Sequence, residues 1–239
     1  MKINIHPAYL FLLFITLLFA CADDSHPEGN SSTPSDTATQ APANGDTANL
    51  QNLVKQYESP QRVVWQKPEL VIDKMGNLSN KVVADIGAGS GFFSRRLAQQ
   101  AKKVIAIDID DRFVHFMDSI KRVELKPEYQ SRFETRLATP DDSRLKPGEA
   151  DIVLIVNTYI YIHDRIGYLR KLLAVLPEGG EILIVDFKKK RIPINNPPPR
   201  IRLELFEVEN ELEEAGFTNI VSDDCALDYQ YIVMAEKRP

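Results

Sequence analysis

The chain has 239 residues, a length that suits one large domain or two small ones. Apolar residues make up 44% of it and charged residues 26%, which excludes a wholly disordered chain and a fibrous repeat. The formal net charge of −5 gives no sign of a basic surface for nucleic acid, and two cysteines are too few for a disulfide scaffold.

The first twenty residues have the pattern of a secretory signal peptide. Lys2 precedes an apolar run, residues 8–20, that only Thr16 interrupts. A membrane-spanning helix needs about 20 apolar residues, so cleavage is favoured over a permanent anchor. Residues 18–21, Leu-Phe-Ala-Cys, resemble a bacterial lipobox, in which Cys21 is lipidated and becomes the new N-terminus. The alternative is an ordinary secretory signal in which Cys21 is incidental.

Residues 21–49 form a predicted disordered linker. After Cys21 the segment contains only small and polar residues, which cannot bury enough apolar surface to offset the entropy of ordering them. As a flexible coil it would reach roughly 30 Å. We therefore expect an exported lipoprotein of the cell envelope, with a domain of residues 50–239 facing the periplasm or the outer surface. Cys225, left without an internal partner, is expected to be a small buried residue.

Alternation of strands and helices follows the linker. Short helices are expected at 50–57 and 68–75. Continuous apolar runs predict strands that are covered on both faces, at 82–86, 104–107, 152–156 and 182–185. Segments with helical spacing lie between them, at 93–101, 113–120 and 166–176. This order indicates a doubly wound α/β sheet.

The last forty residues differ from this alternation. The spacing predicts a helix over 201–215 that stops at Gly216. Residues 217–221 and 227–235 are then expected to form two strands, and the connection between them is too short for a helical crossover. One antiparallel strand should therefore close the sheet.

A glycine-rich loop follows the first predicted strand. It runs from Gly87 to Gly91 and precedes a helix, so glycine lets the chain turn sharply and brings a ligand close to the backbone. A tight turn without a ligand is the alternative. Asp108 ends the second predicted strand, where a carboxylate can accept hydrogen bonds from both hydroxyls of a ribose. It could instead begin a helix cap with Asp110.

Two details of this loop bear on the choice of nucleoside. A dinucleotide fingerprint requires glycine or alanine at its last position, where this chain has Phe92. Asp85 lies two residues before the first glycine, and its charge would repel a pyrophosphate but attract an ammonium group. The loop therefore favours S-adenosylmethionine over NAD.

Several segments together resemble a class I S-adenosylmethionine-dependent methyltransferase. They are 82–98, Asp108, 153–157, the turn at 176–180 and the final hairpin. The resemblance covers about residues 50–239. It implies a Rossmann-like, seven-stranded, mostly parallel sheet with an antiparallel C-terminal strand, and S-adenosylmethionine as the cofactor.

The resemblance also implies a role for each matching residue. The methionine end of the cofactor would contact Asp85 and the loop residues Gly87, Ala88, Gly89 and Gly91; the ribose would bind Asp108, the adenine would lie on Ile109, and Asn157 would line the methyl-transfer side. Many relatives place an aspartate after the third strand to bind the adenine amino group. Here Thr139 occupies roughly that place, and Asp141 or Asp142 could compensate.

The methyl acceptor would enter beside residues 157–164. In open α/β sheets ligands bind at the carboxyl ends of the strands, and this segment follows the fourth strand. His163 is the candidate base because its ordinary pKa is about 6.5; alternatively it only begins the next helix. Tyr159 and Tyr161 could contact the acceptor or serve in packing. No histidine or cysteine cluster has the spacing of a metal site.

The acceptor is predicted to be a small molecule or a lipid-associated molecule. A basic loop over 188–200 could attract an anionic one, although a solvated loop is the simpler interpretation. A catalytically silent nucleoside-binding lipoprotein and a nicotinamide-dependent oxidoreductase are the alternative functions. No motif in the sequence selects the acceptor.

Overall fold

The computed structural model describes residues 44–238. The predicted signal peptide, Cys21 and the linker up to residue 43 lie outside the described residues. All of the described residues belong to one compact unit.

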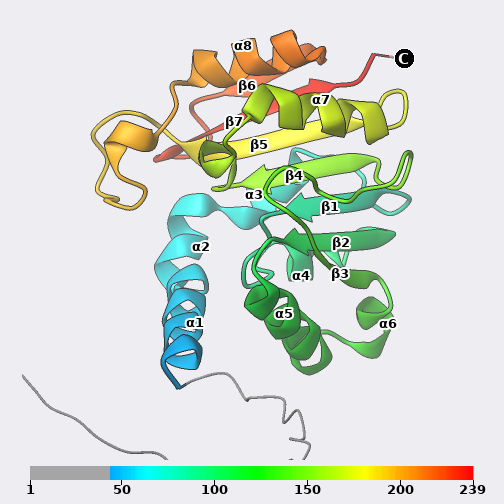
Figure 1. Cartoon of the computed structure of the whole chain (residues 1–239), viewed down its shortest axis with the longest axis vertical. Helices are drawn as coiled ribbons and strands as arrows, with labels where there is room; N and C mark the ends of the chain where they lie inside the picture. The colour runs from blue at the N-terminus through cyan, green and yellow to red at the C-terminus, as the bar shows by residue number, and fades with distance from the viewer. Residues whose placement is uncertain (1–43, 239) are drawn as a thin grey trace, which may run out of the picture. The chain divides into compact units, whose positions relative to one another are not determined.

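Seven strands form a single sheet in the order β3-β2-β1-β4-β5-β7-β6 (Figure 1). Their bounds are Val82–Ile86 (β1), Lys103–Asp108 (β2), Phe133–Leu137 (β3), Ile152–Val156 (β4), Glu181–Phe187 (β5), Thr218–Asp223 (β6) and Gln230–Glu236 (β7). The pairs among β1 to β5 are parallel, and β7 is antiparallel to both of its neighbours. The doubly wound sheet is confirmed. The antiparallel strand β7 lies between β5 and β6 rather than at the edge.

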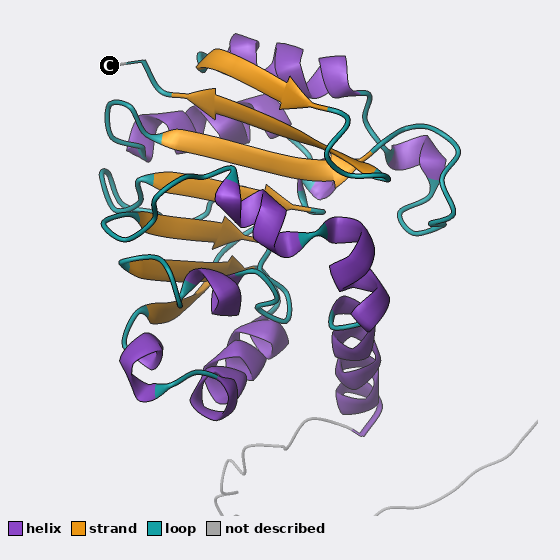
Figure 2. Ribbon diagram, turned by 180° about the vertical axis from the view of Figure 1, so that it is seen from behind, coloured by secondary structure: helices purple, strands orange, loops and turns teal. Residues whose placement is uncertain are grey.

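Helices cover both faces of this sheet (Figure 2). They are α1 (Asn44–Tyr57), α2 (Pro60–Gln66), α3 (Pro68–Asp73), α4 (Ser94–Leu97), α5 (Asp111–Glu124), α6 (Pro127–Gln130), α7 (Arg165–Val175) and α8 (Leu205–Ala215), with short 3-10 turns η1 (Tyr159–Tyr161) and η2 (Pro199–Ile201). The order of the strands reverses between β1 and β4. Open α/β sheets bind ligands at such a reversal, outside the carboxyl ends of the strands.

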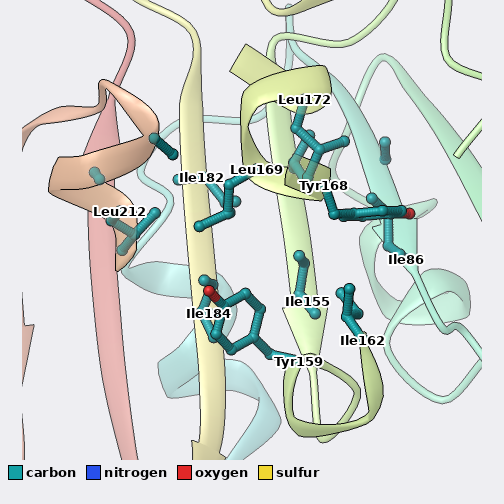
Figure 3. Packing of buried hydrophobic residues seen from close by; sticks show 14 of the residues in the cluster. Ile86, Ile155, Tyr159, Ile162, Tyr168, Leu169, Leu172, Ile182, Ile184 and Leu212 are labelled. Atoms are coloured by element: carbon teal, nitrogen blue, oxygen red, sulfur yellow. The ribbon is translucent and has the colours of Figure 1, made fainter. Parts of the chain in front are cut away.

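Two buried clusters fill the space between sheet and helices. Successive strand side chains point to opposite faces, so Ala84 and Val83 of β1 belong to different clusters. Leu169 and Leu172 of α7 and Leu212 of α8 pack on one face, against central isoleucines such as those of β5 (Figure 3). The other face packs against α3, α4 and α5. With both faces covered, the strands are apolar throughout, which made four of them predictable.

Three predicted helices have different limits in the structure. The helix expected at 50–57 begins at Asn44, so 44–49 are helical rather than part of a disordered linker. Once the packed turn at Tyr57 fixes a helix, each further residue adds a backbone hydrogen bond at little cost. The segment 93–101 is a regular α-helix only over α4; after it, the N–H groups of Gln99 and Gln100 bond three residues back instead of four. The C-terminal helix begins at Leu205 and stops at Gly216 as predicted.

One strand was not predicted, and one expectation needs correction. β3 has no continuous apolar run because it is an edge strand, and only Phe133 is fully buried in it. Cys225 is an exposed free thiol rather than a buried residue. It lies in the connection between β6 and β7, where its backbone N–H donates to Asp223 Oδ1 at 3.0 Å. A tight surface turn leaves no room to bury its side chain.

Candidate active site

The glycine loop is fastened to the end of β2. The backbone N–H groups of Gly87 and Ala88 both donate to the carbonyl of Ile107, at 2.8 and 3.0 Å. Gly87 has a φ of +73°, and a Cβ there would lie 2.2 Å from Thr158 Oγ1. Only glycine therefore lets the loop approach the residue after β4. Both backbone N–H groups already have an acceptor within the protein, so they are not free to bind a pyrophosphate. The sequence had led us to expect unpaired N–H groups here, at the start of a helix.

Asp85 is a buried carboxylate, 2% exposed, near the end of β1 and two residues before this loop. Ser94 Oγ donates to its Oδ2 at 2.5 Å. Burial raises its pKa to about 6, while Ser94 and the charge of Arg62 oppose that rise. Among the described residues no lysine or arginine forms an ion pair with Asp85. A buried carboxylate without a cation in contact is unfavourable, so a ligand ammonium group would stabilise it.

Asp108 joins the loop to the end of β2. Its Oδ2 accepts the N–H of Gly89 at 2.8 Å, and its Oδ1 accepts the N–H of Asp110 at 2.9 Å. Burial raises the pKa of this carboxyl as well. Asp110, and not Asp108, is the N-cap of α5, through the N–H of Arg112. Each oxygen of Asp108 keeps a second lone pair, so the carboxylate can accept hydrogen bonds from two ribose hydroxyls.

Apolar side chains are exposed beside Asp108. Ile109 directly follows it and is 60% exposed. Leu137, the partner of Asp108 on β3, is exposed as well. A flat aromatic base could cover both. Thr139, at the end of β3, donates its hydroxyl to Asp141 Oδ1 at 2.9 Å. Thr139 also bonds to the backbone of Asp142, so Asp141 contributes its side chain at this position and Asp142 its backbone.

The N-terminal helices cover the loop, which the sequence did not indicate. The ring of Tyr57 lies 3.2 Å from the position that a Cβ on Gly89 would take. The same ring stacks on Phe113 of α5, with centroids 5.5 Å apart. Glu58 accepts from the hydroxyl of Ser90 and pairs with Arg95 at 2.6 Å. The loop and the helices α4 and α5 therefore hold the end of α1 against the loop.

A second polar group lies where β4 and β7 face α2. Asn157 follows β4 with a φ of +57°, a conformation that asparagine tolerates better than most residues. Its Oδ1 accepts from Gln230 Nε2, and Gln230 Oε1 accepts from Gln66 Nε2 at 3.0 Å. Gln66 Oε1 in turn accepts from Arg62 Nε. Neither glutamine was predicted, because Gln66, Asn157 and Gln230 are far apart in sequence.

Two buried charges organise the neighbouring basic loop. Asp186 of β5 is fully buried and accepts the N–H groups of Phe187 and Ile160; burial raises its pKa to about 7. Arg202, also buried, donates to the carbonyls of Pro197 and Lys190 at 2.9 and 3.3 Å. The basic loop is thus wrapped around one guanidinium group.

His163, the candidate base, is exposed between η1 and α7. Within residues 44–238 no hydrogen bond or ion pair of its ring is found. Asp164 beside it is the N-cap of α7, which matches the alternative that this pair only begins a helix. Tyr159 is buried, and its hydroxyl donates to Glu211 at 2.6 Å, which indicates a packing role. Tyr161 is exposed and free to meet an acceptor.

Comparison with known proteins agrees with this geometry. A family model described as "Methyltransferase domain" matches residues 84–184, which include the glycine loop, Asp108 and Asn157. This part of the chain is similar to a methyltransferase domain. The match confirms the predicted enzyme class and, with it, S-adenosylmethionine as the cofactor of such a domain.

Individual relatives are distant. The chain is 26% identical over 129 residues to the ubiquinone biosynthesis O-methyltransferase of Aeromonas salmonicida, covering 53% of this chain and 49% of that protein. It is 25% identical over 162 residues to phosphoethanolamine N-methyltransferase 1 of Arabidopsis thaliana, covering 63% and 32%. The chain therefore spans about half, or less, of the length of these curated relatives.

A solved structure confirms the fold. The structure of a SAM-dependent methyltransferase from Aquifex aeolicus superposes with a TM-score of 0.68 at 24% identity. The superposition covers 77% of this chain and 96% of that one. Within residues 44–238, no helix combines the length and the apolar character that crossing a bilayer requires.

Proposed function

We propose that this chain transfers the methyl group of S-adenosylmethionine to an acceptor that enters over the carboxyl ends of β4 and β5. The observation that carries the proposal is the pair of buried carboxylates at the glycine loop. Asp85 offers a negative charge for the cofactor's ammonium group, and Asp108 offers two acceptor oxygens for its ribose.

When bound, the cofactor supplies a methyl group that is already activated as a sulfonium. The chain then has to align the acceptor with that methyl group and to exclude water. Tyr57, held over Gly89 by its stack on Phe113, covers the cofactor side. The loop around Arg202 borders the acceptor side, where Lys190 and Arg191 are exposed and would attract an anionic acceptor.

The test is a transfer assay with labelled methyl groups. The purified full chain is incubated with methyl-labelled S-adenosylmethionine and an extract of the source cells, and labelled products are separated by mass. We expect a labelled product that disappears when Asp108→Ala replaces the natural chain. Cofactor binding without any labelled product would favour the catalytically silent nucleoside-binding protein instead.

We further propose that the domain is exported and anchored through lipidated Cys21, so that it acts on a small-molecule or lipid-associated acceptor at a membrane. The support is the signal-like run before Cys21 and the polar segment after it. Mass spectrometry of the mature N-terminus decides this. An acylated Cys21 is expected; an intact Met1 on a membrane-bound chain would contradict export, and an unmodified Cys21 after cleavage would contradict the anchor.

A further inference from the structure

A buried chain of side-chain amides leads from α2 to the end of β4. Gln66 and Gln230 are both fully buried, and Asn157 is half-buried. Arg62 donates to Gln66, Gln66 donates to Gln230 at 3.0 Å, and Gln230 donates to Asn157. Every bond in the chain points in the same direction, from the guanidinium group toward Asn157.

The direction of the chain follows from the chemistry of its first member. A guanidinium group has five N–H donors and no acceptor, so Gln66 must turn its oxygen toward Arg62. Burial lowers the pKa of Arg62 only to about 10, which leaves it charged at neutral pH. Each following amide then receives a donor on its oxygen and presents its own NH₂ group to the next.

Asn157 is the last member, and its Nδ2 is the end of the chain. Its Oδ1 accepts the hydrogen bond from Gln230. Within residues 44–238 of the polypeptide, its Nδ2 has no hydrogen-bond partner. Asn157 lies at the reversal of strand order, and Thr158, which follows it, contacts Gly87 of the cofactor loop. The free NH₂ group therefore lies at the border between the cofactor side and the acceptor side.

We infer that Asn157 donates a hydrogen bond to the methyl acceptor and that the acceptor atom is an oxygen, with Gln230, Gln66 and Arg62 as positioning residues. The inference rests on the proposed function and names its substrate class. A hydroxyl or phenolate oxygen has more than one lone pair, so it can accept from Asn157 and still attack the methyl group. A neutral amine has a single lone pair, which a hydrogen bond from Asn157 would occupy.

The step balances without another reactant. A lone pair of the acceptor oxygen forms the new C–O bond while the bond between methyl and sulfur breaks, and that electron pair returns to the sulfonium, leaving a thioether. A hydroxyl acceptor releases its proton to water; a phenolate has none to release. The oxygen loses negative charge as the bond forms, so Asn157 orients the acceptor rather than activating it.

Substitution of Gln230 tests the direction of the hydrogen bonds that run from Arg62 to Asn157. In Gln230→Glu, a protonated carboxyl can still accept from Gln66 and donate to Asn157, but an ionised carboxyl can only accept, which turns the amide of Asn157 over. Transfer by Gln230→Glu should therefore equal that of the natural chain at low pH and fall at least tenfold as the introduced carboxyl ionises. KM for S-adenosylmethionine should change less than twofold.

Gln230→Met is the matched control, because methionine has a similar size and no charge. In this variant nothing fixes the orientation of the Asn157 amide, so activity should be lower at every pH. The additional pH-dependent fall expected for Gln230→Glu should be absent. Thermal unfolding shows that each variant is folded. Arg62, Asp85, Glu58 and Asp186 also carry charge near this region, and they are common to both variants. Equal pH profiles for the two variants would overturn the inference.

Two readouts separate this inference from the proposed function. Labelled products from the extract should carry O-methyl groups, and an N-methyl product would overturn the inference while leaving methyl transfer intact. Absence of any product would contradict the proposed function, and the amide direction is then decided by NMR of the side-chain NH₂ groups. We expect those of Gln66 and Gln230 to be protected from hydrogen exchange and that of Asn157 to exchange faster; the reverse order would overturn the inference.

Discussion

The two halves of the carboxyl edge are built differently. The half at β1 and β2 takes its polar groups from one short stretch, residues 85–110. Its carboxylates bond within that stretch, Asp108 to backbone N–H groups and Asp85 to the hydroxyl of Ser94. The half at β4, β5 and β7 takes its groups from positions as far apart as Arg62 and Gln230, and they bond to one another through side chains. We call the first half local, because its groups come from one stretch of sequence, and the second half assembled, because its groups come from distant positions. The local half binds a cofactor that is always the same, whereas the residues of the assembled half can differ between proteins with different acceptors.

The largest effect is expected in the local half, from Asp108→Ala. The ribose would lose two charge-assisted hydrogen bonds at about 1.5–3 kcal/mol each, and the loop would lose its bond to Gly89. Affinity for S-adenosylhomocysteine, measured by calorimetry, should fall more than about 100-fold. Asp110→Ala is the control: it removes the cap of α5, costs about 1 kcal/mol of stability and leaves affinity unchanged. Equal losses in both variants would make Asp108 a structural residue only.

A smaller loss is expected from Asp85→Asn. The amide keeps the shape of the side chain but removes the charge that faces the ligand ammonium group, which should weaken S-adenosylhomocysteine by about 2 kcal/mol, roughly 30-fold. The ligand-free chain should not be less stable at pH 7, because burial disfavours the ionised carboxyl that is removed. Calorimetry and thermal unfolding measure the two effects; lower stability with unchanged affinity would contradict a binding role.

The acidity of Asp85 predicts how binding depends on pH. Its pKa, raised by burial to about 6, means that the charged form dominates above pH 6 and the neutral form below it. A ligand ammonium group needs the charged form, so Kd for S-adenosylhomocysteine should be constant from pH 8 to 7. It should then rise about tenfold for each pH unit below 6. The same titration of Asp85→Asn should lack this rise, and a rise that persists in the variant would assign it to another group.

The smallest effect is expected in the assembled half, from His163→Ala. His163 is exposed, and within residues 44–238 its ring makes no hydrogen bond or ion pair, so transfer rates should change by less than about twofold. A larger fall, with a changed pH profile of the transfer rate, would restore His163 as the base. Transfer into the same extract, measured from pH 5 to 9, makes the comparison.

The difference between the halves also explains what the sequence could predict. Asp85, the glycines and Asp108 lie within one strand-loop-strand unit, so their spacing alone indicated a nucleoside site. Gln66 and Gln230 come together only because α2 passes over the start of β7, and nothing in the sequence near either one signals that contact. The position of Tyr57 could not be predicted either, since its contact with Gly89 depends on the path of α1.

Burial of charge was equally hard to foresee. Asp186 and Arg202 lie in segments that predict a strand end and a helix start, yet both are buried and each is satisfied by backbone groups of the acceptor side. The edge strand β3 was missed because half-exposed strands carry no continuous apolar run. Local periodicity thus predicts the covered core and the cofactor loop, and tertiary contacts determine the rest.

The most direct test of the central claim is a calorimetric cycle on the full chain. S-adenosylhomocysteine carries the ammonium group, 5′-methylthioadenosine has the nucleoside without it, and NAD has a pyrophosphate instead. For the natural chain we predict the order S-adenosylhomocysteine, methylthioadenosine, NAD, from tightest to weakest, with Asp85→Asn removing the advantage of the first over the second. Tight binding of NAD alone, or an advantage of the ammonium ligand that survives Asp85→Asn, would contradict the account.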